Sequence, residues 1–273
     1  MKTNPPSANH TSKQGAHETP ASFEFHPIGW VNSPYKEKFG TPRQPGLVSE
    51  TKGSILLRDD LNPDSLEGLS DYSHAWIVFV FHENESVRTG KPNLKTKVHP
   101  PRLQGKSIGV FATRSPHRPN PIGLSLVAIE RIVGRHIHIR GLDVIDGTPV
   151  LDIKPYLPSV ESLADAHEGW SAAVPVKTVD VEWSPRALQE LAQFVDGENE
   201  RLSTRGAIEK ILELDPRPVA YRGTADNPDP YTKRYGFRFK DWNVIFVMLP
   251  PVTENSQRRA RIEGIEAWPP KES

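Results

Sequence analysis

Short apolar segments with the alternation of β-strands follow one another from about residue 23 to residue 183. They are rich in β-branched and aromatic side chains and are bounded by glycine and proline, as strands are. The predicted strands are Phe23–Val31, Ser54–Leu57, His74–His82, Ser107–Thr113, Leu124–Ile132, His136–Val144 and Val176–Trp183. Because no amphipathic helix of about ten residues separates them, the pattern disfavours a doubly wound parallel sheet. The pattern predicts a closed or nearly closed antiparallel β-barrel.

The pattern changes to helical spacing near residue 184. Ser184 is suited to cap a helix that has Pro185 in its first turn. The residues predicted to share the inward face of this helix are Leu188, Leu191, Ala192 and Val195. A second helix is predicted to begin at Ser203 or Thr204, with Ile208, Ile211 and Leu212 inward, and to end at Asp215-Pro216. Three more strands are predicted at Arg217–Arg222, Tyr235–Phe239 and Trp242–Met248.

This change of pattern predicts the domain organisation. Residues 1–21 are polar and have almost nothing to bury, which is typical of a disordered N-terminal tail. We expect a β-barrel domain at 22–183 and a small α+β domain at 184–250, so the predicted fold class is mainly β. Residues 251–273 are interpreted as a polar tail of unknown role.

Composition narrows the class of protein. Among 273 residues, 34 Lys+Arg balance 34 Asp+Glu and 36% are apolar, as in ordinary globular proteins. The sequence contains no cysteine, which excludes disulfides, a thiolate nucleophile and cysteine-ligated metal centres. The longest apolar run, Ala75–Phe81, is far shorter than the roughly 20 residues that cross a bilayer. With no apolar signal core near the N-terminus, these features predict a cytoplasmic protein without a membrane partner.

Three motifs that would indicate other functions are absent or incomplete. Gly105-Lys106-Ser107 resembles the end of a phosphate-binding P-loop, but Pro100 occupies the position of its first glycine. The glycine fingerprint of a Rossmann fold does not occur anywhere in the sequence. His136 and His138 could face a metal from one strand, but no third ligand is suitably spaced. An exposed polar strand face, with Ile137 and Ile139 inward, is the favoured interpretation, and no metal is expected.

A basic segment between Glu85 and Glu130 carries the strongest functional signal. It contains no acidic residue, and its positive side chains are Arg88, Lys91, Lys95, Lys97, Arg102, Lys106, Arg114 and Arg118. Such segregation of charge within a neutral chain suits phosphate or carboxylate partners. Pro116, Pro119 and Pro121 stiffen the part that holds the last two arginines. Stiffening lowers the entropic cost of bidentate anion recognition.

The stretch Arg114-Ser115 followed by Arg118-Pro-Asn-Pro-Ile-Gly123 resembles the signature of the TrmO (TsaA-like) family. Further stretches agree with this family: Ser33–Phe39 with Pro42–Gly46, Trp76–His82, Asp143–Thr148, Val150–Pro158 and Asp215–Arg222. The resemblance covers about Phe23 to Val247. It implies an S-adenosylmethionine-dependent tRNA methyltransferase that has a β-barrel in place of a Rossmann domain and acts as a homodimer. The implied reaction methylates N6 of threonylcarbamoyladenosine at position 37, in the anticodon loop of tRNA.

The resemblance also implies a set of residues that bind the cofactor. They are Gln44, Pro45, Gly46, His82, Glu83, Arg114, Leu124, Asp143, Val144, Ile145 and Asp146. S-adenosylmethionine carries a carboxylate, an ammonium, a sulfonium and ribose hydroxyls, so its site needs both signs of charge. Arg114 is suited to pair with the carboxylate, and Asp143 or Asp146 could accept hydrogen bonds from hydroxyls or the ammonium.

The acceptor nitrogen is a poor nucleophile, because its lone pair is delocalised into a purine and a carbonyl group. Catalysis therefore needs close positioning and either a base or a field that favours the anion. The polar residues expected to serve the acceptor are Arg118, Asn120, Asp152, Lys154 and Tyr156. Arg118 or Lys154 could pair with the threonyl carboxylate. The sequence does not identify which residue is the base.

The C-terminal domain has its own basic residues, interleaved with aromatic ones. The basic set is Arg217, Arg222, Lys233, Arg234, Arg238 and Lys240, and the aromatic set is Tyr221, Tyr231, Tyr235 and Phe237. This combination suits gripping a phosphate backbone and stacking on exposed bases. Two other functions remain open: a β-barrel module that binds RNA or an anion without catalysis, and a methyltransferase that acts on another acceptor.

Overall fold

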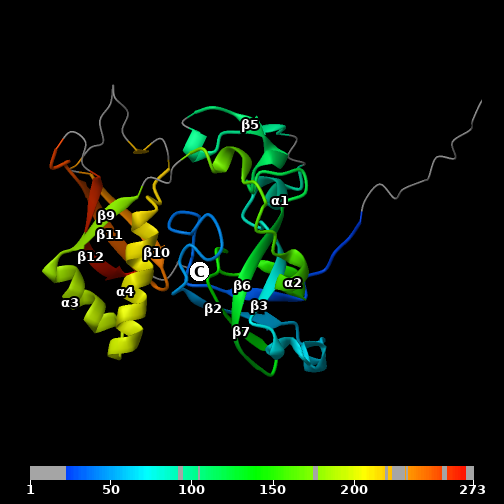
Figure 1. The fold of residues 1–273 in the computed structure, drawn as a ribbon. Coiled ribbons are helices and arrows are strands. Elements are labelled where there is room, and N and C mark those ends of the chain that lie inside the picture. The colour runs from blue at the N-terminus through cyan, green and yellow to red at the C-terminus, as the bar shows by residue number, and fades with distance from the viewer. Residues whose placement is uncertain are drawn as a thin grey trace, which may run out of the picture.

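The computed structural model describes residues 23–91, 95–103, 105–174, 178–218, 221–222, 231, 233–253 and 257–268. Two β-structures lie side by side in it, a closed barrel and a separate four-stranded sheet accompanied by two helices (Figure 1). The predicted fold class, mainly β with an antiparallel barrel followed by an α+β part, is confirmed. The predicted tail 1–21 lies outside the described residues.

Antiparallel strands close the barrel in the order β1-β2-β7-β6-β3-β8. Their bounds are β1 Gly29–Asn32, β2 Lys52–Leu57, β3 His74–Val80, β6 Ile122–Val133, β7 His136–Arg140 and β8 Pro149–Pro155. The sequence pattern missed β8, which pairs with both β1 and β3 and so closes the barrel. Its proline, aspartate and lysine residues weaken the strand signal, because these types are depleted in strands.

β3 illustrates why the alternating pattern identified the other barrel strands. Ala75, Ile77 and Phe79 are buried, and the side chains between them are more exposed. On β6, Gly123 pairs with Phe79, and a Cβ atom added to this glycine would lie 2.2 Å from Cζ of Phe79. The glycine that ends the Arg-Pro-Asn-Pro-Ile-Gly stretch is therefore required by the packing of Phe79.

A long excursion, residues 81–121, leaves the barrel between β3 and β6 and carries the basic segment. It contains α1 Glu85–Thr89, the short ladder of β4 Lys97–Val98 with β5 Ile108–Gly109, and 3₁₀ turns at 101–103 and 110–112. The predicted strand Ser107–Thr113 is wrong beyond Gly109. The chain turns at Val110, whose carbonyl accepts a hydrogen bond from the Thr113 hydroxyl.

The second sheet has the strand order β10-β11-β12-β9. Its strands are β9 Val179–Trp183, β10 Arg234–Phe239, β11 Trp242–Leu249 and β12 Arg258–Ala267. β9 pairs in parallel with β12, so the strand predicted at 176–183 belongs to this sheet and not to the barrel. The prediction of a polar tail at 251–273 is wrong for β12, which lies between β11 and β9. Arginine and glutamate side chains alternate there with buried Ala260 and Ile262, which hides the apolar period.

Helices α3 Pro185–Phe194 and α4 Glu198–Glu213 accompany this sheet, and α2 Pro158–Glu161 follows the barrel. The Ser184 cap is confirmed, because its hydroxyl accepts a hydrogen bond from the Ala187 amide at 3.1 Å. Leu191 and Val195 are buried as predicted. Leu188 and Ala192 are exposed, because the buried face is turned toward Ala187.

Two further predictions for this region need correction. Helix α4 begins at Glu198, earlier than Ser203, although Ile208, Ile211 and Leu212 are buried as predicted. Of the strand predicted at Arg217–Arg222, none of the described residues is in a strand. The chain turns there, because Asp215 has a φ of +46° and is followed by Pro216 and Pro218, which disfavour regular structure in the residues before them.

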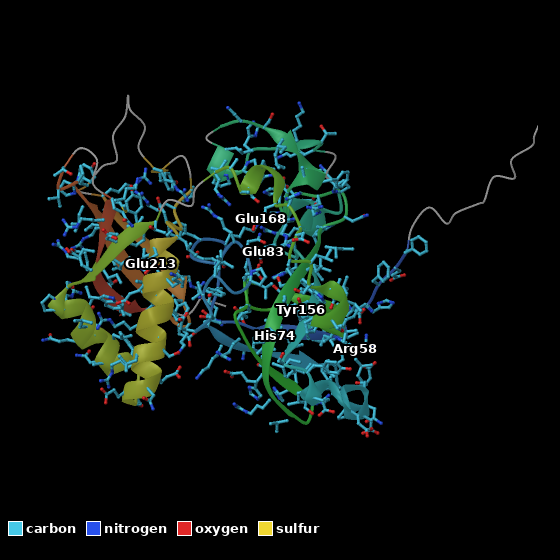
Figure 2. The ribbon with its side chains drawn as sticks, viewed as in Figure 1. Arg58, His74, Glu83, Tyr156, Glu168 and Glu213 are labelled. Atoms are coloured by element: carbon cyan, nitrogen blue, oxygen red, sulfur yellow. The ribbon has the colours of Figure 1, made fainter. Side chains whose placement is uncertain are left out.

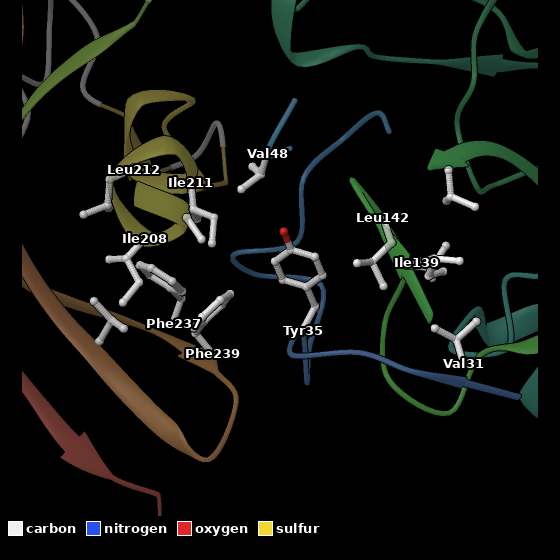
Figure 3. Packing of buried hydrophobic residues seen from close by; sticks show 14 of the residues in the cluster. Val31, Tyr35, Val48, Ile139, Leu142, Ile208, Ile211, Leu212, Phe237 and Phe239 are labelled. Atoms are coloured by element: carbon white, nitrogen blue, oxygen red, sulfur yellow. The ribbon is translucent and has the colours of Figure 1, made fainter. Parts of the chain in front are cut away.

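The segment 33–51 joins the barrel to the second sheet, and Tyr35 is its centre. Tyr35 is 0% exposed and forms an antiparallel bridge with Phe239, with its ring 5.9 Å from the Phe239 ring. Its hydroxyl is hydrogen-bonded to Oγ1 of Thr51 at 2.7 Å, and burial raises the pKa of this phenol, which therefore stays neutral. Figure 3 shows the Tyr35 ring between Phe237 and Phe239 on one side and Leu142 on the other.

We expect Tyr35→Phe to lower the free energy of unfolding by about 1–3 kcal/mol, because the buried Thr51 hydroxyl loses its partner. Tyr35→Ala should cost about 3–5 kcal/mol, because it also leaves a cavity between the two sheets. Urea denaturation measures both values. Tyr72→Phe, at a tyrosine 38% exposed, is the matched control. Equal small effects at both positions would show that Tyr35 does not join the two sheets.

Candidate functional site

The loop that carries Gln44, Pro45 and Gly46 is fixed beside the end of β7 by backbone hydrogen bonds. The Gly46 amide donates to the Gly141 carbonyl at 2.8 Å, and the Gly141 amide donates to the Thr51 carbonyl at 3.0 Å. Both glycines have positive φ, +75° and +72°, which other residues rarely adopt. A Cβ atom on Gly141 would lie 3.6 Å from Cα of Gly46. The anchoring residues of the Tyr35 segment therefore also position this loop.

Three of the predicted cofactor residues come together beside this loop. Nη1 of Arg114 donates to Oε1 of Gln44 at 2.7 Å, a contact between residues far apart in the sequence. Asp143 is close enough to Arg114 for their charges to interact. The carboxylate of Asp143 also accepts a hydrogen bond from the Ser125 hydroxyl at 2.5 Å. The result is a guanidinium, a side-chain amide and a carboxylate beside an exposed glycine backbone.

Asp143 has an unusual protonation equilibrium. Burial raises its pKa to about 6, although the Ser125 hydrogen bond and the Arg114 charge act in the opposite direction. Ser125 is itself buried on β6, among apolar barrel residues. The carboxyl group therefore changes charge near neutral pH, where a bound cation or hydrogen-bond donor would favour the ionised form.

The other residues of the segment 143–146 have structural partners. The Asp146 carboxylate accepts hydrogen bonds from the Ser33 amide at 2.8 Å and from Nζ of Lys36 at 2.9 Å. The Val144 carbonyl accepts from the Ser33 hydroxyl, and the Ile145 carbonyl accepts from Thr148. Asp146 thus ties the start of the 33–51 segment to the barrel, and Asp143 is the carboxylate with the fewer partners.

His82, Glu83 and Leu124 lie at the edges of this site. His82 and Glu83 are 3.8 Å apart, from Nε2 to Oε1, and Nζ of Lys38 donates to the Glu83 carbonyl at 2.6 Å. Figure 2 shows Glu83 between the barrel strands and the excursion. Leu124 is 53% exposed on β6 and pairs with Val78, whose other neighbour on β8 is Asp152. Leu124 and Asp152 therefore share one outward face.

The residues predicted to serve the acceptor fall into two groups. Asp152 and Lys154 on β8 are paired at 2.7 Å, and the Tyr156 ring packs against Trp76 at 5.9 Å between centroids. Arg118 belongs to the excursion, where Nη1 donates to the Thr113 carbonyl at 2.9 Å. Asn120 is exposed in the same segment. Part of the Arg118 guanidinium therefore stabilises the stiff loop itself.

The prediction that the basic and aromatic residues of the C-terminal domain form a binding surface is wrong for several of them. Arg217 is 0% exposed, and Tyr235 and Phe237 belong to the core, where they cannot stack on bases. Arg238 packs over the Trp268 ring at 4.5 Å, and Lys240 pairs with Glu200 at 3.2 Å. Of the remaining set, Tyr221 is 50% exposed with Nζ of Lys233 4.6 Å from its ring.

Sequence reasoning missed the side-chain contacts of Ser125, Lys36 and Lys38, which donate to Asp143, Asp146 and the Glu83 carbonyl respectively. Ser125 could have been found, because it is a polar residue at an inward position of an otherwise apolar strand. The two lysines carry no local signal, since their partners lie in distant segments.

Metal sites and membrane-spanning helices are both absent from the part of the chain that the structure describes. No group of three or more His, Asp or Glu side chains there could hold a metal ion. His136 and His138 stack on each other on β7, with Ile137 and Ile139 buried as predicted. No helix among the described residues is long and apolar enough to cross a membrane.

The fold and site define a class of protein: a closed antiparallel barrel with a mixed-charge site, joined through a buried segment to a smaller α+β sheet. The family model described as "tRNA-methyltransferase O N-terminal domain" matches residues 30–162. The model described as "TrmO C-terminal domain" matches residues 176–264. The chain belongs to the TrmO family of tRNA methyltransferases, and the predicted resemblance is confirmed.

Relatives and a solved structure agree with this membership. The tRNA (adenine(37)-N6)-methyltransferase of Escherichia coli (strain K12) is 40% identical over 230 residues, 82% of this chain and 92% of that protein. A Pseudomonas aeruginosa protein, named as a candidate S-adenosylmethionine-dependent methyltransferase, is 43% identical over 220 residues, 80% of this chain and 89% of that protein. The crystal structure of TrmO from Pseudomonas aeruginosa has a TM-score of 0.69 and 32% identity, covering 90% of this chain and 99% of that chain.

We expect Asp143→Asn to change how stability depends on pH. Because the folded pKa of about 6 is above the ordinary value of 3.8, the folded chain binds this proton more tightly than the unfolded chain. The stability that this bound proton contributes is fully present below the pKa of Asp143 in the unfolded chain, and it is lost as pH rises through 6. Without ligand, the variant should therefore gain stability relative to the wild type between pH 4 and pH 8, by on the order of 1–3 kcal/mol. Urea denaturation across this range measures the difference, and parallel profiles would contradict it.

Proposed function

We propose that this chain transfers a methyl group from S-adenosylmethionine to N6 of threonylcarbamoyladenosine at position 37 of tRNA. The observation that carries this proposal is the match of both TrmO family models, in order, along one chain. The Escherichia coli relative is named for methylation of adenine 37 at N6. The absence of a Rossmann glycine fingerprint agrees with a barrel that holds the cofactor.

The donor set around Gln44 fits S-adenosylmethionine. Arg114 supplies a guanidinium for the carboxylate of the methionine part, and Asp143 supplies an acceptor for the ammonium or the ribose hydroxyls. Pro45, Gly46 and Leu124 offer backbone groups and apolar surface for the adenine. When bound, the cofactor supplies an electrophilic methyl group on a sulfonium. We therefore propose that Asp143 acts in its ionised form, which a bound cationic group would favour.

The acceptor side of the reaction is assigned to the face that Leu124 shares with Asp152. The nitrogen to be methylated must lose a proton, so a carboxylate near it is useful. Nζ of Lys154 lies 2.7 Å from the carboxylate of Asp152 on an exposed strand, and this contact orients the carboxylate. Lys154, whose side chain is 67% exposed, is positioned to pair with the threonyl carboxylate. Three further side chains would complete the acceptor site: Arg118, Asn120 and Tyr156.

We also propose that two copies assemble through the outer face of the barrel. Ile122 and Leu124 are 41% and 53% exposed on β6, beside outward-facing Val80 and Val78 of β3. Exposed apolar side chains follow after β8: Leu157, Val160 and Leu163. Exposed apolar side chains of this number are typical of a surface that binds a protein. A homodimer would cover Leu124 and so close one edge of the cofactor site.

The threonylcarbamoyl group should be required for methylation. Sites built to pair a charged group reject analogues that lack it, because their own charges are then left unpaired. The test incubates the protein with tritiated cofactor and either fully modified tRNA or its unmodified transcript, then identifies the labelled nucleoside after digestion. We expect label only in N6-methylated threonylcarbamoyladenosine. Equal labelling of both RNAs would assign the activity to another acceptor.

Arg114→Ala should weaken cofactor affinity by about 1.5–3 kcal/mol, the usual contribution of a hydrogen bond to a charged group. Isothermal titration calorimetry with S-adenosylmethionine measures the loss. Arg131→Ala, at an exposed arginine near the far end of β6, is the control and should bind normally. Unchanged affinity in the Arg114 variant would remove this residue from the cofactor site.

A further inference from the structure

The excursion between β3 and β6 buries few of its own side chains. Of its described residues, 81–91, 95–103 and 105–121, only Asn84 and Val110 are buried. Long loops that bury little apolar surface open locally at a small cost in free energy. Arg114, which donates to Gln44 at 2.7 Å, belongs to this excursion. Contacts from other parts of the chain are therefore needed to keep the Arg114 guanidinium beside the loop of Gln44.

One such contact comes from the connecting segment, residues 162–174, which follows α2 and leads toward β9 of the second sheet. Every residue from Leu157 to Gly169 is exposed, whereas Trp170 is partly buried. Nε1 of Trp170 donates a hydrogen bond to the Ala112 carbonyl at 2.8 Å. The connecting segment lies beside the excursion in Figure 1 as well. It is therefore attached to the excursion two residues before Arg114.

Arg102 makes a second contact, in the opposite direction. It lies in the 3₁₀ turn 101–103 of the excursion, and its Nη2 donates to the Ser171 carbonyl at 2.6 Å. The same nitrogen also donates to the Val174 carbonyl. A single hydrogen bond would let the two segments rotate about it, whereas two contacts at separate points fix their relative orientation. We call the hydrogen bonds of Trp170 and Arg102 the clasp.

The clasp continues directly into the backbone that carries Arg114. The Ala112 carbonyl accepts from Trp170, and the next carbonyl, that of Thr113, accepts from Nη1 of Arg118 at 2.9 Å. The side chain of the third residue, Arg114, then forms the contact with the loop of Gln44. Because each peptide unit is planar and rigid, fixing these two carbonyls restricts where the following side chain can lie. The clasp therefore acts on the position of Arg114.

We propose that Trp170 and Arg102 are positioning residues for cofactor binding: their clasp holds Arg114 where it pairs with the carboxylate of S-adenosylmethionine. This inference rests on the proposed cofactor site. Loss of the clasp should weaken the carboxylate contact and leave the adenine and ribose contacts as they are. Since the connecting segment leads on to β9, the position of Arg114 depends on a part of the chain that lies outside the barrel.

The first test compares two ligands by isothermal titration calorimetry on the full chain. S-adenosylmethionine carries the carboxylate, and 5′-methylthioadenosine has the same adenine and ribose without the amino-acid part. Trp170→Phe keeps an aromatic ring and removes the N–H donor. It should weaken S-adenosylmethionine binding by about three- to tenfold and leave methylthioadenosine binding unchanged, and Arg102→Gln should do the same. An equal loss for both ligands would overturn the proposal, as would unchanged S-adenosylmethionine affinity in both variants.

Trp30→Phe and Arg88→Gln are the matched controls. Trp30 is 44% exposed on β1, and Arg88 is exposed in α1 of the same excursion. Both variants should bind S-adenosylmethionine as the wild type does, and a loss equal to that of the clasp variants would contradict the proposal. In an Arg114→Ala background, Trp170→Phe should have no further effect, because the group that it positions is gone. A further loss of the same size would show that Trp170 acts elsewhere.

Hydrogen–deuterium exchange of the ligand-free chain tests the clasp itself. Trp170→Phe and Arg102→Gln should raise exchange at the amides of residues 109–118 and leave exchange in β3 at its wild-type rate. Unchanged exchange at 109–118 in both variants would overturn the proposal. Thermal melting shows whether each variant is folded, and if one does not fold, the other decides. A wild-type chain that does not bind S-adenosylmethionine would remove the proposed function, while the exchange rates would still decide whether the clasp holds this segment.

Discussion

The packing of Tyr35 between two sheets is the constraint on which the rest of the structure depends. Its ring fills the space between Phe239 and the barrel, and its hydroxyl joins Thr51 at 2.7 Å. Because both ends of the segment 33–51 are fixed in this way, the residues between them cannot move independently of either sheet. The hydrogen bond from the Lys240 amide to the Pro34 carbonyl at 2.7 Å strengthens the same junction. The loop of Gln44 is therefore held at a boundary between two bodies.

This boundary explains how distant charges can serve one site. Gln44 meets Arg114 of the excursion, and the charge of the neighbouring Arg43 interacts with that of Asp215, which follows α4. A loop on a single sheet would reach one of these groups only. In the proposed enzyme, the segment 33–51 connects the barrel, which would hold the cofactor, to the second sheet. Asp215 is supported by the buried Arg217, as Asp143 is supported by Ser125.

Local sequence rules succeeded where one face of an element is apolar and the other is polar. β3, the Ser184 cap and the buried face of α4 follow from alternation, capping and helical spacing. These rules failed where hydrogen bonding to neighbouring strands outweighs the low strand propensity of the residues themselves. β8 contains proline and charged residues but closes the barrel, and β12 contains outward arginines but lies inside its sheet. Tyr235 and Phe237, which were predicted to stack on bases, are buried. The prediction failed because an aromatic pattern does not show which face of a strand is covered.

By itself, the sequence determined the class of the fold and the absence of nucleotide-binding glycine loops, since these follow from spacing over short ranges. Its motifs also carried the resemblance that identified the family. It also predicted a role for the loop of Gln44 and for the stiff arginine segment. Only the tertiary structure decided which polar groups meet: Arg114 with Gln44, Asp143 with Ser125, and Arg217, Arg222 and Arg258 with Asp215. The physical reason is that charge compensation and burial depend on distances between segments far apart in the chain, and these distances exist only once the barrel and the second sheet have packed around Tyr35.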